Sequence, residues 1–214
     1  MEGIPTIMRR SSLAAVAAIG SVSLLLAGCS KADDGSDGGN KSAGANAATK
    51  DVVNASTKKG GTVTYAMSDV PDSFDPGNTY YAYMYNFSRL YARPLMTFKP
   101  DAGEKGNTLV PDLASAPGKQ SDGGKTWTYT IRKGLKYQDG SPITSKDVKY
   151  AVERSNFARD VLSLGPNYFQ QVLKGGDKYK GPYKDKSAEG LTSIETPDDT
   201  TIVFHLNQAF QEFD

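Results

Sequence analysis

The sequence has very little of the chemistry on which metal sites and many enzymes depend. It has one cysteine and one histidine among 214 residues. A single cysteine excludes an intrachain disulfide and a cysteine cluster, and a single histidine excludes the common two-histidine zinc sites. The charge is nearly balanced, with 25 Lys and Arg against 24 Asp and Glu, so no basic field for nucleic acid is expected. We therefore expect no metal, no other cofactor and no nucleic-acid partner.

A glycine-rich segment is the one feature that points to nucleotide binding, and it fails on two counts. Residues 123–126, Gly-Gly-Lys-Thr, resemble the end of a Walker A loop, but Lys119 occupies the position where that motif begins with glycine. Residues 127–131 then alternate like a strand, whereas a phosphate loop must open a helix whose amides face the phosphate. Nucleotide binding is therefore not expected.

Hydrolytic chemistry finds little support in the residues. His205 falls in a predicted strand, where we expect it to be solvated, and no Gly-x-Ser-x-Gly segment supplies it with a nucleophile. The pairs Asp33-Asp34 and Asp198-Asp199 lie in linker or turn composition, where solvation accounts for them. We do not expect an enzyme. A secreted hydrolase stays the alternative, and it predicts an activity that is lost when His205 is mutated.

Residues 1–28 have the parts of a secretory signal peptide. Arg9 and Arg10 form a basic start, an uncharged and mainly apolar run follows, and the small residues Ala27 and Gly28 end it. The run is rich in Ala, Ser and Gly, and small residues at its exit favour cleavage over retention in the membrane. The arginine pair faintly resembles a twin-arginine signal, so both export routes stay open.

The single cysteine stands at the end of this signal. Residues 26–29, Leu-Ala-Gly-Cys, resemble a bacterial lipobox, which implies cleavage before Cys29 and attachment of a diacylglyceryl group to its thiol. Two acyl chains suffice for stable membrane attachment. The alternative, a buried thiol, fits poorly between an apolar run and a polar tract. Residues 29–59 have no aromatic residue and predict a disordered linker that tethers the folded region to the lipid.

The folded region is expected from residue 60 onward, because all 21 aromatic residues lie there. Apolar residues alternate with polar ones at 62–67, 127–132 and 200–206, which predicts three strands. Asp139-Gly140 predicts a turn. The inward positions expected for the first and last of these strands are Val63, Tyr65 and Met67, and Ile202, Phe204 and Leu206.

Two helices are expected between these strands. Residues 79–91 carry apolar side chains at helical spacing, and a second helix begins at Thr144 or Ser145 with Asp147 in its first turn. Strands mixed with helices predict an α/β or α+β fold. The positions expected to face the core are Tyr83, Phe87, Leu90 and Tyr91 in the first helix and Val148, Ala151 and Val152 in the second.

A run of tyrosines occupies residues 80–85, Tyr-Tyr-Ala-Tyr-Met-Tyr. Tyrosines this close together on a helix point in several directions, so they cannot all enter one core. Tyrosine offers an amphipathic contact surface of low side-chain entropy, which suits peptides or sugars. Packing alone stays the alternative for any single one of them.

Several segments, in order along the chain, resemble the solute-binding protein family 5 of ABC importers, which includes oligopeptide, dipeptide and nickel receptors. The most specific is residues 121–148, which resembles the family signature W-T-F-x-L-R-x-G-V-K-F-x-D-G-x-P-x-T-A-x-D-V. The other segments are residues 60–64 (Gly-Gly-Thr-Val-Thr), 73–76 (Ser-Phe-Asp-Pro), 109–114 (Leu-Val-Pro-Asp-Leu-Ala) and 194–206.

The resemblance implies an α/β fold, the first lobe of a type II periplasmic-binding-protein-like architecture with an additional subdomain. Residues 60–88 and 190–214 would belong to lobe I and residues 89–189 to the additional subdomain. Family members are more than twice as long, so the second lobe is expected to be missing and the chain to be a fragment. The segment after Ser-Phe-Asp-Pro would border the cleft, which makes Tyr80, Tyr81, Ala82 and Tyr83 the substrate-binding candidates.

The function implied is that of an exported lipoprotein at the outer face of the cytoplasmic membrane or in the periplasm. It would capture peptides or similar solutes and deliver them to ABC permease and ATPase subunits. A solute-sensing or adhesive surface lipoprotein without a transport role is the alternative. Neighbouring permease and ATPase genes would favour import.

Overall fold

The computed structural model describes residues 49–53, 55–67 and 69–214. The chain divides into units 1–40 and 41–214, and every described residue belongs to the second unit. The predicted signal peptide and Cys29 lie outside the described residues. In the part that the structure describes, no helix is both long and apolar enough to cross a membrane.

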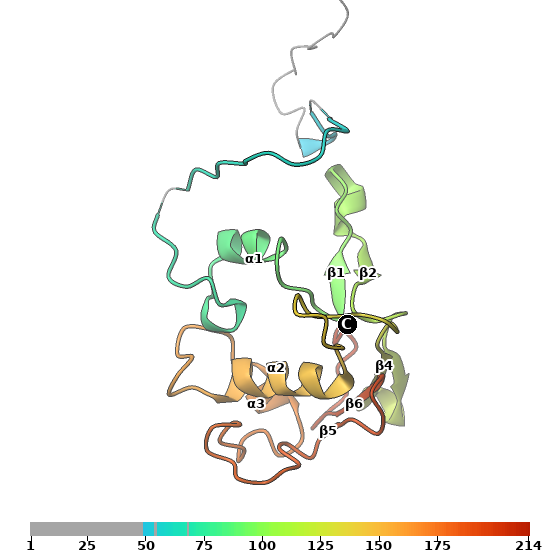
Figure 1. Ribbon diagram of the computed structural model, residues 1–214. Helices are drawn as coiled ribbons and strands as arrows, with labels where there is room; N and C mark the ends of the chain where they lie inside the picture. The colour runs from blue at the N-terminus through green and yellow to red at the C-terminus, as the bar shows by residue number, and fades with distance from the viewer. Residues whose placement is uncertain (1–48, 54, 68) are drawn as a thin grey trace, which may run out of the picture. The chain divides into compact units, whose positions relative to one another are not determined.

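Short helices and strands alternate along the chain (Figure 1). In the part of the chain that the structure describes, the α-helices are α1 (Ala82–Ser88), α2 (Ser145–Phe157) and α3 (Phe169–Val172). The strands there are β1 (Met96–Phe98), β2 (Leu109–Pro111), β3 (Lys119–Ser121), β4 (Thr126–Thr130), β5 (Ile194–Glu195) and β6 (Thr201–His205). The chain also forms the 3-10 turns η2 (Pro76–Asn78), η3 (Gly103–Asn107) and η4 (Asp122–Gly124).

The main sheet is antiparallel throughout, in the order β3-β4-β6-β5, and β1 and β2 form a separate pair. Trp127 pairs with Phe204 and Tyr129 with Ile202 between the two central strands. All four side chains are buried, because period-two alternation sends them to the same face. The two strands predicted at 127–132 and 200–206 are thereby confirmed.

The hydrophobic core lies on this face of the sheet. α2 contacts β6 and α3, so the helices cover the buried face of the strands. The buried residues of the core are Leu113, Ala114, Trp127, Tyr129, Ile131, Val148, Phe157, Leu173, Leu191, Ile194, Ile202, Phe204 and Leu206. All of these buried residues lie between residues 113 and 206, and Met96 of β1 packs against them from outside that range.

α2 begins as the sequence predicts. Thr144 is the N-cap, and the Thr144 amide donates to Asp147 Oδ2 at 2.7 Å as part of a capping box. Val148 is buried, but Ala151, expected beside it, is exposed. The inward-facing stripe passes through the buried residues 145, 148 and 156 and the half-buried residue 152 in steps of three and four, and Ala151 falls outside it.

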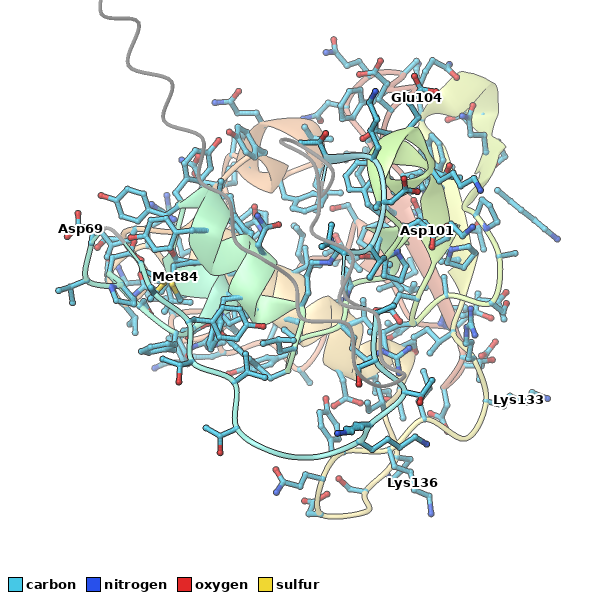
Figure 2. The ribbon with its side chains drawn as sticks, turned by 90° about the horizontal axis from the view of Figure 1, so that it is seen from above. Asp69, Met84, Asp101, Glu104, Lys133 and Lys136 are labelled. Carbon is cyan, nitrogen blue, oxygen red and sulfur yellow. The ribbon has the colours of Figure 1, made fainter. Side chains whose placement is uncertain are left out.

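The loop between β4 and α2 contains the turn predicted at Asp139-Gly140. The Tyr137 amide donates to the Ser141 carbonyl at 2.8 Å, and Gly140 has a φ of 89°, a conformation that favours glycine. Lys133 and Lys136 extend from this loop into solvent (Figure 2). The glycine-rich residues 123–126 lead into β4 rather than a helix, as expected.

The N-terminal part of the folded region differs from the prediction in two places. No strand forms at 62–67, where Val63, Tyr65 and Met67 are all exposed. A strand needs a partner, and the backbone of these residues has none among the described residues.

The helix predicted at 79–91 is shorter than expected, and a different face is buried. α1 ends at Ser88, so Leu90 and Tyr91 lie beyond it and are exposed. Met84, labelled in Figure 2, and Ser88 are its buried residues. Tyr83 and Phe87 are half-buried one position away. The larger aromatic rings therefore flank the buried stripe rather than form it.

Candidate functional site

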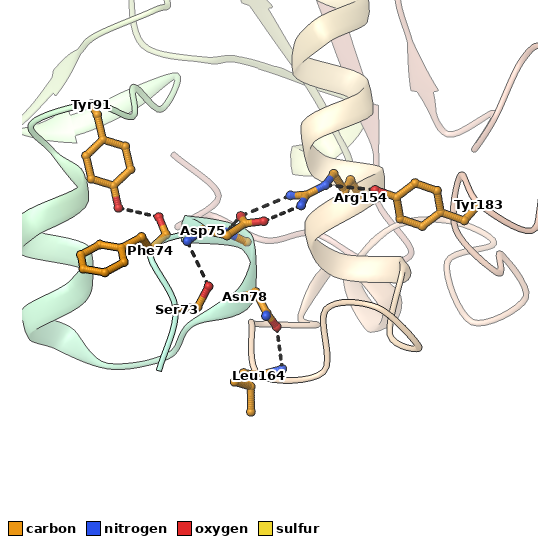
Figure 3. Close-up of polar contacts among 9 residues, drawn as sticks. Ser73, Phe74, Asp75, Asn78, Tyr91, Arg154, Leu164 and Tyr183 are labelled. Atoms are coloured by element: carbon orange, nitrogen blue, oxygen red, sulfur yellow. Dashed lines mark hydrogen bonds and ion pairs between the residues drawn. The ribbon is translucent and has the colours of Figure 1, made fainter. Parts of the chain in front are cut away.

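The turn that precedes the tyrosines is organised by Asp75 (Figure 3). The Asp75 amide donates to Ser73 Oγ at 3.0 Å, and Asp75 Oδ1 accepts from the Gly77 amide at 2.8 Å. Asp75 thus caps η2, and Pro76 suits the first position of that turn because it has no amide hydrogen to leave unpaired. The sequence Ser-Phe-Asp-Pro therefore reverses the chain direction just before the tyrosine run.

The structure brings the four predicted binding residues to the start of α1. Tyr80 is 57% exposed and Tyr81 is 51% exposed, and Ala82 is also exposed. Tyr83 is half-buried, and its ring stacks on that of Tyr81 with centroids 5.3 Å apart. Tyr80 and Tyr81 therefore present their rings to solvent, whereas Tyr83 does so only in part. Whether they bind a solute stays a prediction.

The Tyr83 hydroxyl is the unusual group in this set. It is buried and has no hydrogen-bond partner in the described part of the chain. Burial, and then the charges of Asp69 and Asp72, raise the pKa of Tyr83 above its usual value. A buried hydroxyl without a partner costs free energy. An acceptor that formed a hydrogen bond with this hydroxyl would remove that cost.

A fifth residue, which the sequence analysis missed, joins the four. The hydroxyl groups of Tyr80 and Tyr168 are in hydrogen-bond contact, and their ring centroids lie 6.3 Å apart. Tyr168 precedes α3 and is exposed. It is 88 residues from Tyr80, so no local periodicity could have related the two. We call Tyr80, Tyr81, Ala82, Tyr83 and Tyr168 the tyrosine surface.

The buried residue Thr79 stabilises the start of the tyrosine run through two hydrogen bonds. Its side chain is 1% exposed and donates to Asp72 Oδ1 at 2.6 Å. The Tyr85 hydroxyl donates to the Thr79 carbonyl at 3.0 Å. Together with the buried Met84, these bonds hold the beginning of α1 in one orientation.

An ion pair links the same segment to α2. Arg154 Nη1 donates to Asp75 Oδ1 at 3.2 Å, and Arg154 Nη2 contacts the other carboxylate oxygen (Figure 3). The hydrogen bond from Arg154 holds the pKa of Asp75 below its usual value and raises the pKa of Arg154. Arg154 Nε also donates to the Tyr183 hydroxyl at 3.2 Å. Both charged groups stay ionised at neutral pH.

A hollow of about 700 Å³ lies between α2 and residues 179–197. The buried carboxylate of Glu153 lines this hollow and already accepts hydrogen bonds. Glu153 Oε1 accepts from the Leu191 amide at 2.7 Å, and Oε2 accepts from the Tyr179 hydroxyl at 3.1 Å. The hollow therefore offers solvent-exposed polar groups but no free buried charge.

His205 faces away from the core, as expected, but it is half-buried rather than fully solvated. Its Nε2 lies 2.9 Å from Glu195 Oε1, and its Nδ1 lies 3.3 Å from Thr126 Oγ1. Both ring nitrogens thus have partners on neighbouring strands. Across residues 49–53, 55–67 and 69–214, no three His, Cys, Asp or Glu side chains form a metal-binding group.

Comparison with known proteins gives consistent matches. The model of the bacterial extracellular solute-binding proteins, family 5 (middle region), matches residues 108–214, which is half of the chain. The probable D,D-dipeptide-binding periplasmic protein DdpA of Escherichia coli is 34% identical over 120 residues, covering 56% of this chain and 19% of that protein. Heme-binding protein A of Haemophilus influenzae is 28% identical over 210 residues, covering 94% of this chain and 34% of that protein.

Solved structures agree with these relatives. Clavulanic acid biosynthesis oligopeptide binding protein 2 matches with a TM-score of 0.73 and 46% identity, over 78% of this chain and 30% of that one. The Haemophilus influenzae OppA complex with the peptide RPPGFSPFR matches with a TM-score of 0.50 and 26% identity, over 66% and 26% of the two chains. The fold is thus that of part of a periplasmic peptide-binding protein. The chain spans about a fifth to a third of the length of the curated relatives described above.

Proposed function

The chain belongs to the bacterial extracellular solute-binding proteins of family 5, and from this premise we propose that it captures peptides or similar small solutes outside the cytoplasm. The observation that carries the proposal is the tyrosine surface, where the exposed rings of Tyr80 and Tyr81 follow the capped turn η2 and Tyr168 contacts Tyr80. Relatives named as dipeptide-binding and a solved relative in complex with a nonapeptide support peptides as the class of solute.

The tyrosine surface suits an extended peptide for a physical reason. Tyrosine rings bury a large apolar area while their hydroxyl groups can pair with backbone amides and carbonyls. Such contacts depend little on the identity of the peptide side chains. In this proposal Tyr80, Tyr81, Ala82 and Tyr83 form part of one cleft wall, and lobe I comprises residues 60–88 and 190–214 with residues 89–189 as the additional subdomain.

The proposal extends to the placement of the protein in the cell. After cleavage of residues 1–28, Cys29 would carry the lipid that holds the protein at the outer face of the membrane, with residues 29–59 as the tether. The small residues before Cys29 and the polar tract after it support this arrangement. ABC permease and ATPase subunits would take up the captured solute, as the family implies.

Calorimetric titration of the complete gene product with a peptide library tests the proposal. We expect saturable binding, and we expect Tyr80→Ala and Tyr81→Ala to weaken it about tenfold each, because aromatic residues at binding surfaces commonly carry more than about 1 kcal/mol. Tyr137→Ala is the matched control, since Tyr137 is similarly exposed but lies on the Asp139-Gly140 turn.

Two results would contradict the proposal. Flat titrations with peptides, sugars and nickel would remove the solute-binding role itself. Saturable binding that Tyr137→Ala weakens as much as Tyr80→Ala does would instead keep solute binding and remove the tyrosine surface from it.

A further inference from the structure

The Asp75–Arg154 ion pair restricts the relative orientation of its two side chains. Both terminal nitrogens of Arg154 face the two carboxylate oxygens of Asp75, and Arg154 Nε is held from the other side by the Tyr183 hydroxyl. A two-pronged contact of this kind restricts the relative rotation of its partners. The guanidinium plane is therefore oriented from both sides (Figure 3).

The carboxylate held by Arg154 also defines where the tyrosine surface begins. The oxygen that accepts from Arg154 Nη1 is the one that caps η2 through the Gly77 amide. η2 ends at Asn78, and the buried Thr79 connects it to Tyr80. A displacement of Asp75 would therefore be transmitted through a short, well-bonded segment to the first tyrosine.

Two further contacts attach η2 to the loop between α2 and α3. Asn78 Oδ1 accepts from the Leu164 amide at 3.2 Å. A Cβ placed on Gly165 would lie 2.0 Å from the Gly77 carbonyl oxygen, so only glycine permits this approach. The loop that supplies Tyr168 is thus held against η2 at the same place as the ion pair.

We propose that Arg154 is a positioning residue, which orients the tyrosine surface for solute through Asp75. The inference rests on the proposed function. The ion pair is only about 70% buried on either side, with side-chain exposures of 30% and 31%, and pairs that exposed contribute little to global stability. In this proposal the pair instead orients the tyrosine surface relative to α2, the helix that carries Arg154. The Asp-Pro motif at residues 75–76 then serves to place Asp75 opposite Arg154.

The test combines amide hydrogen exchange with peptide titration on the complete gene product. We expect Arg154→Gln to accelerate exchange at Gly77 and Asn78 roughly two- to fivefold and to weaken peptide binding by a similar factor, with exchange in β4 unchanged. Arg154→Lys keeps the charge without the two-pronged contact and should restore part of both effects. Asp75→Asn retains an oxygen that can cap η2 and should reproduce Arg154→Gln.

Arg93→Gln is the control, because it removes another partly exposed arginine–aspartate pair, with Asp112, that does not touch η2. It should leave both readouts unchanged. Unaltered exchange in Arg154→Gln would overturn the inference, and so would weaker binding without altered exchange, since that indicates direct contact with solute. Faster exchange in Arg154→Gln alongside flat titrations of the unmodified protein would support the positioning role and overturn the proposed function.

Discussion

Two parts of the chain use aromatic residues in opposite ways. In the sheet region, residues 109–206, the aromatic residues of the central strands, Trp127, Tyr129 and Phe204, are buried and their rings contact one another or their neighbours. The exposed tyrosines of this region, such as Tyr137 and Tyr168, lie outside the strands. In the tyrosine region, residues 60–91, most of the aromatic side chains are exposed or half-buried. Aromatic content alone therefore does not distinguish a core from an exposed surface, because the burial of a ring depends on which other elements pack against it.

The physical cause of the difference is strand pairing. The central strands β4 and β6 are hydrogen-bonded to each other, so their alternate side chains share a face against which α2 packs at β6. Residues 62–67 have the same alternation without a paired neighbour among the described residues. The two regions meet through polar contacts at η2 and through the Tyr80–Tyr168 pair, and the buried core cluster has no residue from 60–91.

The largest effect is expected from breaking the sheet region. Phe204 is 2% exposed and its ring contacts those of Tyr129, Phe169 and Phe213. Phe204→Ala should lower the free energy of unfolding by about 3–5 kcal/mol, because it removes a large buried side chain and leaves a cavity. Urea unfolding followed by circular dichroism measures this change.

Phe74→Ala is the matched control for that experiment, because Phe74 is an aromatic residue of the tyrosine region and is 59% exposed. It should change the free energy of unfolding by no more than about 0.5 kcal/mol, as is usual for surface positions. Equal losses in Phe74→Ala and Phe204→Ala would show that the tyrosine region has a core of its own.

A smaller effect is expected from separating the two regions. Gly165→Ala places a methyl group against the Gly77 carbonyl oxygen, and relieving that overlap should cost about 1–3 kcal/mol locally. The Leu164 amide should then exchange faster with solvent, because its bond to Asn78 is lost. Ser163→Ala, an exposed neighbour in the same loop, should leave that exchange unchanged. Slow exchange at Leu164 in Gly165→Ala would mean that the contact tolerates a methyl group.

The smallest effect is expected from acid. As the pH falls, the Asp75–Arg154 contact should weaken before the sheet region is affected. Arg154 lowers the pKa of Asp75 in the folded protein, so the pair contributes stability above a pH of about 4 and loses it as the pH falls through the lowered pKa. Arg154 and Tyr183, the other ionisable groups at this link, keep their protons throughout that range. Exchange at Gly77, corrected for its intrinsic pH dependence, should therefore rise as the pH falls below about 4.

Asp198 supplies the comparison in the sheet region. Its pKa is about 2, because the Thr200 amide and hydroxyl donate to it. Asp198 therefore stays mainly ionised at pH 3, and the Thr200 amide should keep its protection. Asp75→Asn should abolish the pH dependence at Gly77, whereas a dependence that persists in this variant would point to a different titrating group.

Much of the sheet region could be predicted from local pattern. The alternation around Trp127 and Phe204 marks two strands, and Thr144 with Asp147 marks the start of α2. Capping and alternation are contacts between residues two to four positions apart, so a sequence displays them directly. The buried face of α1 was predicted wrongly, because Met84 is buried by what the rest of the chain places against it.

Local patterns in the sequence predicted most of the helices and strands of the sheet region, and its motifs predicted the family to which the chain belongs. Only the tertiary structure decided which tyrosines stay exposed, that Tyr168 joins Tyr80, and that Arg154 holds Asp75 across 79 positions of the chain. The reason is physical. Periodicity records the face that a residue occupies on its own element, whereas exposure and long-range pairing depend on where the other elements pack.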